Sequence, residues 1–245
     1  MPILPDMGWI KKNRNMSSQQ DMRYEMRHID ERNLDGIMKL QDIVSQRLKD
    51  REIFRTHSAD YFIAHLRMNS SSIGAFTDDG LIAYSILYFP GENEDNFGRD
   101  ISLHADEMNR VAHLATVAVH PAYRGNSLQK SMYAVSLDAV RKMGCKHVCC
   151  MVSPKNFVSL QNIFSHGFLI KALKMKFDRR LRYIMHRHLD YPGTVCSEEV
   201  MIKSTDVWGQ KCLLKRGFFG YGAVAHPGGF SVSYGRDRRS ASSII

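Results

Sequence analysis

The chain lacks the features that mark secreted, membrane-spanning and metal-stapled proteins. No apolar run among its 245 residues approaches the roughly 20 residues that a membrane-spanning helix needs. Residues 1–15 hold no apolar stretch followed by a small-residue cleavage site, so we expect no secretory signal. The five cysteines are odd in number and form no C-x-x-C pair, which argues against a disulfide framework and a structural zinc site. We therefore expect no metal and a reducing, cytoplasmic setting.

The chain has fewer acidic than basic residues. It contains 34 Lys and Arg residues and 25 Asp and Glu residues, which gives a net charge of +9. Such an excess favours an anionic partner, which nucleic acid, anionic lipid or a phosphorylated small molecule would each provide. Much of it lies in residues 171–183 and 235–240. A solvated face and a loose tail explain these stretches better than a binding patch, since no RNA-binding signature with interleaved aromatics accompanies them. Binding of nucleic acid or an anionic surface through residues 171–187 is kept as a disfavoured hypothesis.

The composition is otherwise that of a globular protein with one good core, since 44% of the residues are hydrophobic and 24% are charged. Residues 1–21 are polar and aperiodic, which predicts a weakly ordered lead. Residues 22–190 carry the periodic pattern of the main domain. The character changes after Tyr191-Pro192-Gly193, and residues 191–245 are too few to fold alone. We expect this extension to pack on the main domain and its end to fray.

The hydrophobic periodicity predicts the element order βααβββαβαββ, followed by a small C-terminal α/β appendage. Asn33 and Ser58 are the expected N-caps of the first two helices, and Asp79-Gly80 is a hairpin signal. Ser204 or Thr205 is expected to cap the helix of the extension. The predicted ranges are strand 24–29, helices 34–49 and 58–66, a hairpin around 79–80, strand 113–121, helix 127–144, strand 147–152, helix 156–166, and strands 168–177 and 181–189.

The most informative stretch is VAVHPAYRGNSLQKSMYAV, residues 117–135, in which an apolar strand ends at Pro121 and a tight basic turn opens into a helix. A helix N-terminus presents free N–H groups and the positive end of the macrodipole, so it can hold a pyrophosphate. Gly125 lets a ligand approach the backbone closely, and Arg124 adds positive charge. On mechanism alone, phosphate binding and an ordinary strand–turn–helix are equally supported.

VAVHPAYRGNSLQ resembles the acyl-CoA loop of the GNAT superfamily, written V-x-P-x-Y-R-G-x-G-L-G/A/Q. Ser127 stands where the family usually has glycine, and Gln129 where it usually has glycine or alanine. A serine at this position is tolerable if its φ stays negative. The matching positions are Val119, Pro121, Tyr123, Arg124, Gly125 and Leu128.

A second stretch, SPKNFVSLQNIFSHGF at residues 153–168, resembles the family's N-x-x-(A/S) helix and the G-F that follows it. Asn156, Ser159, Gly167 and Phe168 match. Both motifs stand at the family's usual separation, and the resemblance covers about residues 24–189. It implies an α/β (α+β) fold with a mixed, splayed central sheet and helices on both faces.

The resemblance also implies where acetyl-CoA binds. The backbone of Val117, Ala118 and Val119 would pair with the pantetheine arm like an added strand, and Asn156 would contact the pantetheine or the thioester end. Beside Arg124, the residues implied to hold the pyrophosphate are Gly125, Asn126, Ser127, Leu128, Gln129 and Lys130.

The catalytic residues match less well than the cofactor loop. Many family members use a Glu on a central strand as base and a Tyr on the following helix as acid, and here those positions hold Met151 and Ile163. His113 is a candidate substitute for the base, because an imidazole has a pKa near ~6.5. A merely solvated or hydrogen-bonded histidine is the alternative. Glu107, just upstream, is a second candidate.

These observations predict an N-acetyltransferase that moves an acetyl group from acetyl-CoA to a primary amine by direct transfer. The alternative is a non-catalytic acyl-CoA-binding or regulatory module that has lost its acid and base. We expect no membrane partner, and whether the protein is a monomer or a dimer is left open. The acceptor would be bound by residues 34–66, by residues 171–187 and by the C-terminal extension, and the sequence does not identify it.

Overall fold

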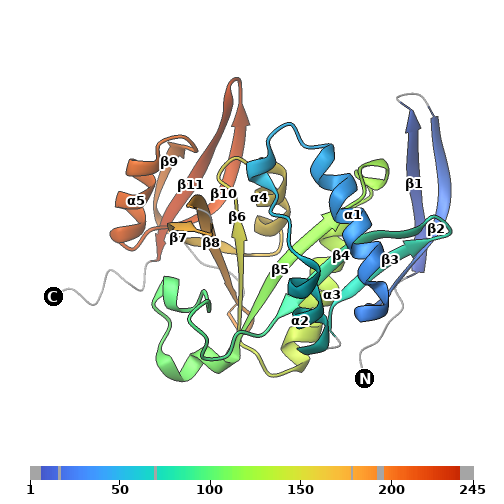
Figure 1. Cartoon of the computed structure of the whole chain (residues 1–245). Helices are drawn as coiled ribbons and strands as arrows, with labels where there is room; N and C mark the ends of the chain where they lie inside the picture. Colours follow the sequence, from blue (N-terminus) through green and yellow to red (C-terminus); the bar gives the residue numbers. More distant parts are fainter. Residues whose placement is uncertain (1–6, 16–17, 69–70, 178, 192–195, 238–245) are drawn as a thin grey trace. The chain divides into compact units, whose positions relative to one another are not determined.

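The computed structural model describes residues 7–15, 18–68, 71–177, 179–191 and 196–237 (Figure 1). These residues form two compact units, and the division does not follow the boundary expected near residue 190. Unit 1 comprises residues 1–89 and 112–144, and unit 2 comprises residues 90–111 and 145–245. No helix of the described chain combines the length and the apolar character needed to cross a membrane.

Unit 1 is built on antiparallel strands paired in the order β1-β2-β3-β4-β5. One buried cluster joins Met132 of the third helix to Met26 and Ile73 of the sheet. A second cluster joins the first two helices, through Ile37 and Phe62, to the sheet. The elements are β1 (Met7–Asn15), β2 (Ser18–His28), α1 (Leu34–Gln46), α2 (Ala59–Met68), β3 (Ile73–Thr77), β4 (Gly80–Tyr88), β5 (Val111–Val119) and α3 (Leu128–Lys142).

Strand β1 corrects the expectation of a weakly ordered lead over residues 1–21. It pairs with β2 from Met7 opposite Glu25 to Asn15 opposite Ser18. Ile10 is buried in the same cluster as Met26, so one apolar side chain in a polar stretch is enough to fix the strand's inner face. Residues 1–6 and 16–17 lie outside the described part of the chain.

The caps of the first two helices differ in outcome. Ser58 accepts from the Tyr61 N–H at 3.3 Å, as expected for the cap of α2. Asn33 makes no side-chain cap for α1, so that prediction is wrong. Its side chain instead accepts from the Asp30 N–H and closes a capping box around η1 (Glu31–Asn33).

Unit 2 contains antiparallel strands paired in the order β6-β8-β7-β10-β11-β9. Before β6, residues 90–110 form a loop with two short helices, η3 (Arg99–Ile101) and η4 (Ala105–Arg110), and Asp100 ties this loop to Lys174 and Lys176. The main elements are β6 (His147–Val152), α4 (Phe157–Phe164), β7 (Leu169–Lys176), β8 (Arg180–His188), β9 (Cys196–Lys203), α5 (Val207–Lys215), β10 (Phe219–His226) and β11 (Gly229–Asp237).

The C-terminal extension therefore packs as β9, α5, β10 and β11 within unit 2. Strand β9 was not among the expected elements, and Asp206 rather than Ser204 or Thr205 caps α5 by accepting from the Gly209 N–H. Gln210 is fully buried and its Oε1 accepts from Tyr183 of β8 and Tyr234 of β11 at 2.5 and 2.8 Å. The predicted frayed end falls largely on residues 238–245, outside the described residues. The expected mixed α/β fold is confirmed.

Candidate functional site

The turn between β5 and α3 is held at both of its ends by buried side chains. Tyr123, the last residue of η5 (Pro121–Tyr123), and Leu128, the first residue of α3, are 1% and 2% exposed and lie in the same core cluster. The segment between them, residues 124–127, is the basic turn singled out in the sequence. The core thus fixes the turn without covering it.

Tyr123 is also held by polar contacts. Its hydroxyl donates to Asp79, in the β3–β4 turn, and Lys12 of β1 forms an ion pair with the same carboxylate at 2.6 Å. Burial first, and then the neighbouring carboxylate of Asp79, raises the pKa of Tyr123, so the phenol stays protonated as a donor. Three separate elements of unit 1 therefore meet directly beneath the turn.

The backbone of the turn twice enters the left-handed region. Gly125 has φ +86°, and a side chain at this position would meet no atom within 4 Å, so its outer side is open. Ser127 has φ +57°, so the condition that its φ stays negative is not met. An L-residue pays roughly 1–2 kcal/mol for this conformation. Ser127 thus adopts, at a cost, the shape that glycine at this position would take freely.

Asn126 connects the turn to β1. Its Oδ1 accepts from the Lys11 N–H at 2.8 Å, and its Nδ2 donates to the Lys11 carbonyl at 2.7 Å. The same Nδ2 donates to the Tyr123 carbonyl at 3.0 Å, and Asn13 donates to the Arg124 carbonyl. The side chain of Asn126 therefore pairs with β1 as a backbone amide would, and the N-terminal hairpin becomes the support of the turn.

The first turn of α3 offers N–H groups to an anion. The first intrahelical hydrogen bond joins the Ser131 N–H to the Ser127 carbonyl, and Ser127 makes no side-chain cap. The N–H groups before Ser131 consequently have no intrahelical acceptor. The charges near the turn also favour an anion. Burial lowers the pKa of His120, and three nearby cations lower it further, which shows a positive field there. These cations are Lys12, Arg124 and Arg47, and Asp79 acts in the opposite direction.

Strand β5 carries a β-bulge that the sequence did not reveal. Leu87 of β4 lies opposite Leu114 and Ile86 lies opposite Thr116, so Ala115 is an extra residue on β5. A bulge bends its strand and re-aims the side chains near it. Beyond it, Val117, Ala118 and Val119 pair regularly with Ser85, Tyr84 and Ala83 of β4.

Asn156 belongs to unit 2, where it caps α4 by accepting from the Ser159 N–H at 3.0 Å. This hydrogen bond joins the two polar positions of the second motif, Asn156 and Ser159, in a helix N-cap. A contact of Asn156 with a ligand stays a prediction. Ile163 is buried in the same helix, and Met151 lies half-buried on β6, so neither position supplies a proton-transfer group.

His113 lies on β5 in unit 1 and is only 2% exposed. Its ring meets the ring of Tyr88 edge-on at 5.6 Å, and Tyr88 in turn contacts His65 of α2. The row continues through Tyr61 to His57. Burial lowers the pKa of His57 to about 4. His113 is thus the inner end of a row of aromatic rings, and not a solvated residue at the end of a strand.

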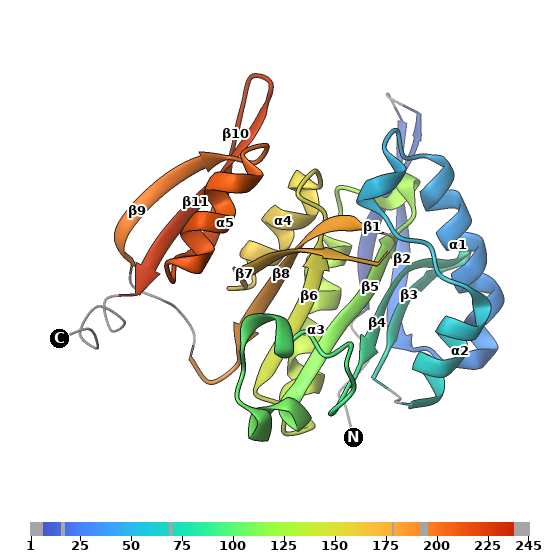
Figure 2. The same ribbon diagram turned by 60° about the vertical axis from the view of Figure 1, so that its left-hand side comes forward.

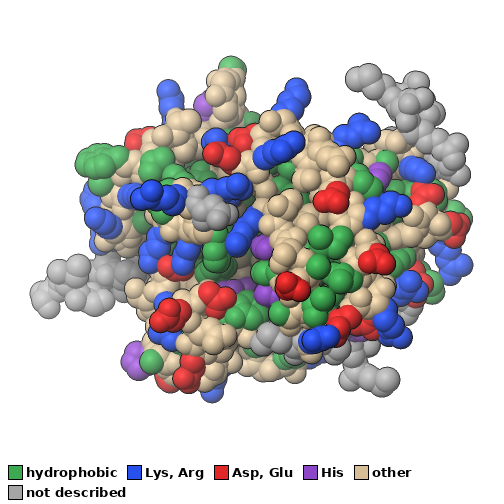
Figure 3. Space-filling model, in the orientation of Figure 1, with side chains coloured by type: hydrophobic (Ala, Val, Ile, Leu, Met, Phe, Trp, Pro, Cys, Tyr) green, Lys and Arg blue, Asp and Glu red, His purple; other side chains and the backbone are tan. Residues whose placement is uncertain are grey.

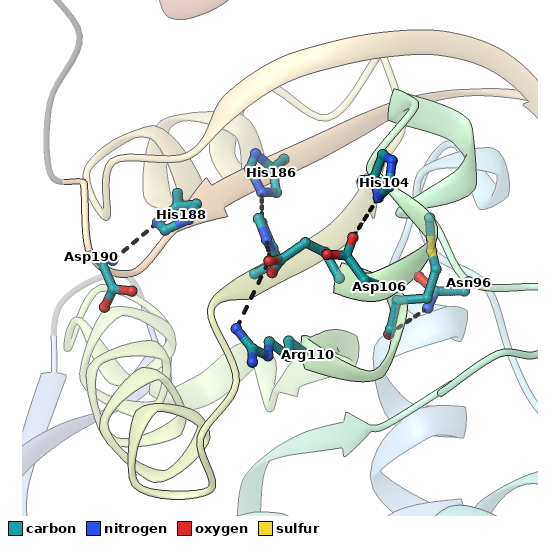
Figure 4. A network of polar contacts seen from close by, with 10 residues as sticks. Asn96, His104, Asp106, Arg110, His186, His188 and Asp190 are labelled. Carbon is teal, nitrogen blue, oxygen red and sulfur yellow. Dashed lines mark hydrogen bonds and ion pairs between the residues drawn. The ribbon is translucent and has the colours of Figure 1, made fainter.

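Glu107 lies in unit 2 and belongs to a network of polar contacts in which Figure 4 labels Arg110 and His186. The Nε2 of His147 lies 3.1 Å from the Glu107 carboxylate, which can only accept, so this nitrogen donates. The Nδ1 of His147 then accepts from His186 Nε2 at 2.9 Å. Burial lowers the pKa of His147 and brings that of His186 to about 3. Glu107 therefore serves as the end of a chain of neutral histidines.

Among the described residues, no group of three or more His, Cys, Asp and Glu side chains is placed to hold a metal ion. Side chains of both charges are present on the face shown in Figure 3, with Lys and Arg in blue and Asp and Glu in red.

The model of one protein family, described as the acetyltransferase (GNAT) family, matches residues 37–168, which is more than half of the chain. No curated protein matches the sequence.

Solved structures similar to this chain include a putative acetyltransferase, yncA, from Salmonella typhimurium with acetyl-CoA, at 18% identity and a TM-score of 0.50 over 71% of this chain and 98% of that one. The NatC complex bound to Gag peptide and CoA is 14% identical, with a TM-score of 0.53 over 67% and 98%. Ard1 from Thermoplasma volcanium is 13% identical, with a TM-score of 0.51 over 67% and 97%. At these identities the likeness shows the fold.

The histidine network predicts a loss of stability in mild acid. Because the pKa of His186 is about 3 in the folded chain and near ~6.5 when unfolded, the unfolded chain binds more protons between these values. The stabilisation is complete above pH 6.5 and is lost as the pH falls, by about 1.4 kcal/mol per unit. Urea unfolding between pH 7 and pH 4.5 measures it.

His186→Gln keeps an N–H donor for His147 and removes the titrating group, so its stability should vary less with pH than that of the wild type. His104→Gln, at an exposed histidine of the same unit, is the matched control and should follow the wild type. Equal pH slopes for the wild type and His186→Gln would contradict the assignment.

Proposed function

The chain belongs to the acetyltransferase (GNAT) family, and on that premise we propose that it is an N-acetyltransferase that moves the acetyl group of acetyl-CoA directly to a primary amine. The observation that carries the proposal is the turn at residues 124–127, with its two left-handed residues and the uncapped start of α3 behind it. A cytoplasmic setting is part of the proposal, supported by the free thiols of Cys145, Cys149, Cys150 and Cys212.

The turn fits the pyrophosphate of acetyl-CoA in shape and in charge. Backbone N–H groups from Gly125 to Lys130 would hold it, because they lie at the positive end of the helix dipole. The open space outside Gly125 leaves room for the phosphate oxygens. The cations that lower the pKa of His120 provide a positive field at the same place. Acetyl-CoA and CoA are the ligands named for the yncA and NatC structures, respectively.

The pantetheine arm would run along β5, pairing with the backbone of Val117, Ala118 and Val119. The bulge at Ala115 supports this assignment, because bulges interrupt regular pairing beside active sites. His113 lies two residues before the bulge on the same strand, so the strand that binds the arm also carries the proposed base.

The chemistry requires a neutral amine that attacks the thioester carbonyl, while one proton leaves the nitrogen and one reaches the departing thiolate. His113 would take the proton from the amine, since imidazole suits this role near neutral pH. Tyr88, which the sequence interpretation did not consider, is the ring neighbour of His113 and carries a phenol. Holding both reactants in place can lower the barrier by roughly 7–11 kcal/mol, so a second proton donor is not obligatory.

Gly125→Asp tests the loop. We expect it to abolish CoA binding, because a carboxylate would oppose the pyrophosphate and a side chain would stand in the open space at a positive φ. Calorimetric titration with CoA measures the loss, and circular dichroism verifies the fold. A folded variant with the affinity of the wild type would remove the loop assignment.

Asn126→Ala tests the support given by β1. Losing its hydrogen bonds to Lys11 should loosen the turn and weaken CoA binding by roughly tenfold, which corresponds to about 1.4 kcal/mol. Lys11→Ala is the matched control, because Asn126 contacts only the backbone of Lys11. An equal loss of affinity in both variants would point to the charge of Lys11 instead.

His113→Ala tests the base. With a primary-amine substrate, kcat should fall by about 100-fold or more while the KM for acetyl-CoA changes much less, since general-base catalysis contributes ~10²–10⁴. Tyr88→Phe, which keeps the ring contact, is the companion variant. An unchanged kcat and pH–rate profile in His113→Ala would exclude His113 as base, and absent turnover in the wild type would favour the non-catalytic alternative.

A further inference from the structure

Two segments of unit 2 repeat one arrangement of elements. Residues 147–188 form β6, α4, β7 and β8, and residues 196–237 form β9, α5, β10 and β11 (Figure 2). Helix α4 follows the cap Asn156 and helix α5 follows the cap Asp206, fifty residues later. Strands β7 and β10 begin at Leu169 and Phe219, again fifty residues apart. Few residues are identical, so the repeat does not show in the sequence alone.

The backbone repeats in detail as well. Each cap accepts from the N–H three residues ahead, at Ser159 and at Gly209. Each helix is followed by a glycine with positive φ, Gly167 or Gly217, whose N–H donates to the carbonyl three residues back. Each glycine precedes a buried phenylalanine. The equivalent hydrogen bonds are Asn156 to Ser153 and Asp206 to Lys203, Leu160 to Asn156 and Gln210 to Asp206, and His166 to Ile163 and Arg216 to Leu213.

The strand registers coincide, including an irregularity. Strand β7 has a bulge between Ile170 and Ala172, and β10 has one between Gly220 and Gly222, the equivalent positions. In the outer pairs, Met151 lies opposite Ile184 and Met201 lies opposite Ser233. Met201 stands fifty residues after Met151, and Ser233 forty-nine after Ile184, because the second hairpin is one residue shorter. A bulge at the same position in both hairpins makes chance similarity a poor explanation.

The two copies face each other about a pseudo-two-fold axis. The strand order β6-β8-β7-β10-β11-β9 reads the same from both ends when equivalent strands are exchanged. The copies meet where Ile170 pairs with Gly220, and these two residues occupy the same position in their copies. The helices pack reciprocally, α4 against β10 and α5 against β7. Such reciprocity is the mark of an isologous interface, in which one patch binds its own copy.

The two sides of the interface have complementary side chains at the axis. A Cβ atom on Gly220 would lie 2.9 Å from Ile170 Cδ1 and 3.0 Å from its Cβ. Ile170 therefore fills the space that Gly220 leaves. Farther from the axis, Phe157 of α4 contacts Phe230 of β11 with ring centroids 5.1 Å apart, and Tyr183 of β8 donates to Gln210 of α5.

We infer that residues 196–237 are a second structural copy of residues 147–188, and that this copy is the built-in partner for the surface formed by β7 and α4. The surface formed by β7 and α4 thus binds a β-α-β-β module with the same arrangement of elements, and the same chain supplies that module. The edge of β7 is thereby closed without a second subunit, which removes an aggregation-prone strand edge. Only half of the acyltransferase fold is copied, and the second copy has no equivalent of the turn at residues 124–127.

An exchange of residues across the axis tests the inference. Ile170→Gly leaves a cavity and Gly220→Ile creates a clash, so each single variant should lower the Tm by roughly 5–10 °C. The double variant Ile170→Gly with Gly220→Ile restores the same pair with its members exchanged. It should recover at least half of the summed loss, because removal of the Ile170 side chain opens the space that the new isoleucine occupies.

The matched control combines Ile170→Gly with Gly222→Ile, which has the same composition but places isoleucine off the axis, where a Cβ atom meets only Ser233 at 3.9 Å. It should show no recovery. A double exchange no more stable than the sum of its single variants would overturn the pseudo-two-fold assignment.

A disulfide between the copies tests whether the partner is intramolecular, even if the exchange variants fail to fold. Ile170→Cys with Gly220→Cys places two thiols on paired residues, within the reach of a disulfide. Under oxidising conditions the purified chain should give a monomer-sized band that shifts on reduction, with each single cysteine variant as control. A covalent dimer specific to the double variant, or no bond at all, would contradict a built-in partner.

Discussion

Tyr123 lies in the core of unit 1 and donates its hydroxyl to Asp79, which also binds Lys12 of the N-terminal strand. With Leu128 buried in the same cluster on the other side, the turn at residues 124–127 has both ends fixed by apolar burial. Everything that the proposed site needs depends on this anchoring. A turn free to move could not keep a row of N–H groups aimed at an anion, because its entropy would be lost on binding.

The anchoring also explains how the chain accommodates a serine in a glycine conformation. Ser127 holds φ +57° because Leu128, next to it, is locked into the core and α3 begins at once. Asn126 contributes by pairing with the backbone of Lys11. Residues 7–15 extend the sheet beyond β2 and hold the turn in place through Lys11, so they support the proposed site. Strain at the turn is offset by burial around it.

Hydrophobic periodicity predicted most element boundaries, and the resemblance to the GNAT family predicted the mixed α/β fold. The acyl-CoA loop, implied by the same resemblance, stays a prediction. Strand β1 was missed because Ile10 alone marks its buried face. The bulge at Ala115 and the pairing of Asn126 with Lys11 depend on partners far away in the sequence, which a local pattern does not reveal. The left-handed φ of Ser127 is likewise imposed by its surroundings.

The repeat within unit 2 was missed for a related reason. It is preserved in hydrogen-bond register, caps and bulges, whereas positions such as Leu160 and Gln210 differ in chemistry. The second copy pairs with the first through β7 and β10 and adds no second turn of the kind found before α3. The proposed acyl-CoA site therefore has no counterpart in the second copy.

The most direct test of the account is calorimetric titration of the full-length chain with acetyl-CoA, repeated with CoA. The anchored turn and its positive surroundings predict binding of both ligands at one site per chain, with micromolar affinity. Absence of binding by the folded protein would show that Ser127 and Gln129 have disabled the turn. Two equivalent sites per chain would contradict the confinement of ligand binding to the turn before α3.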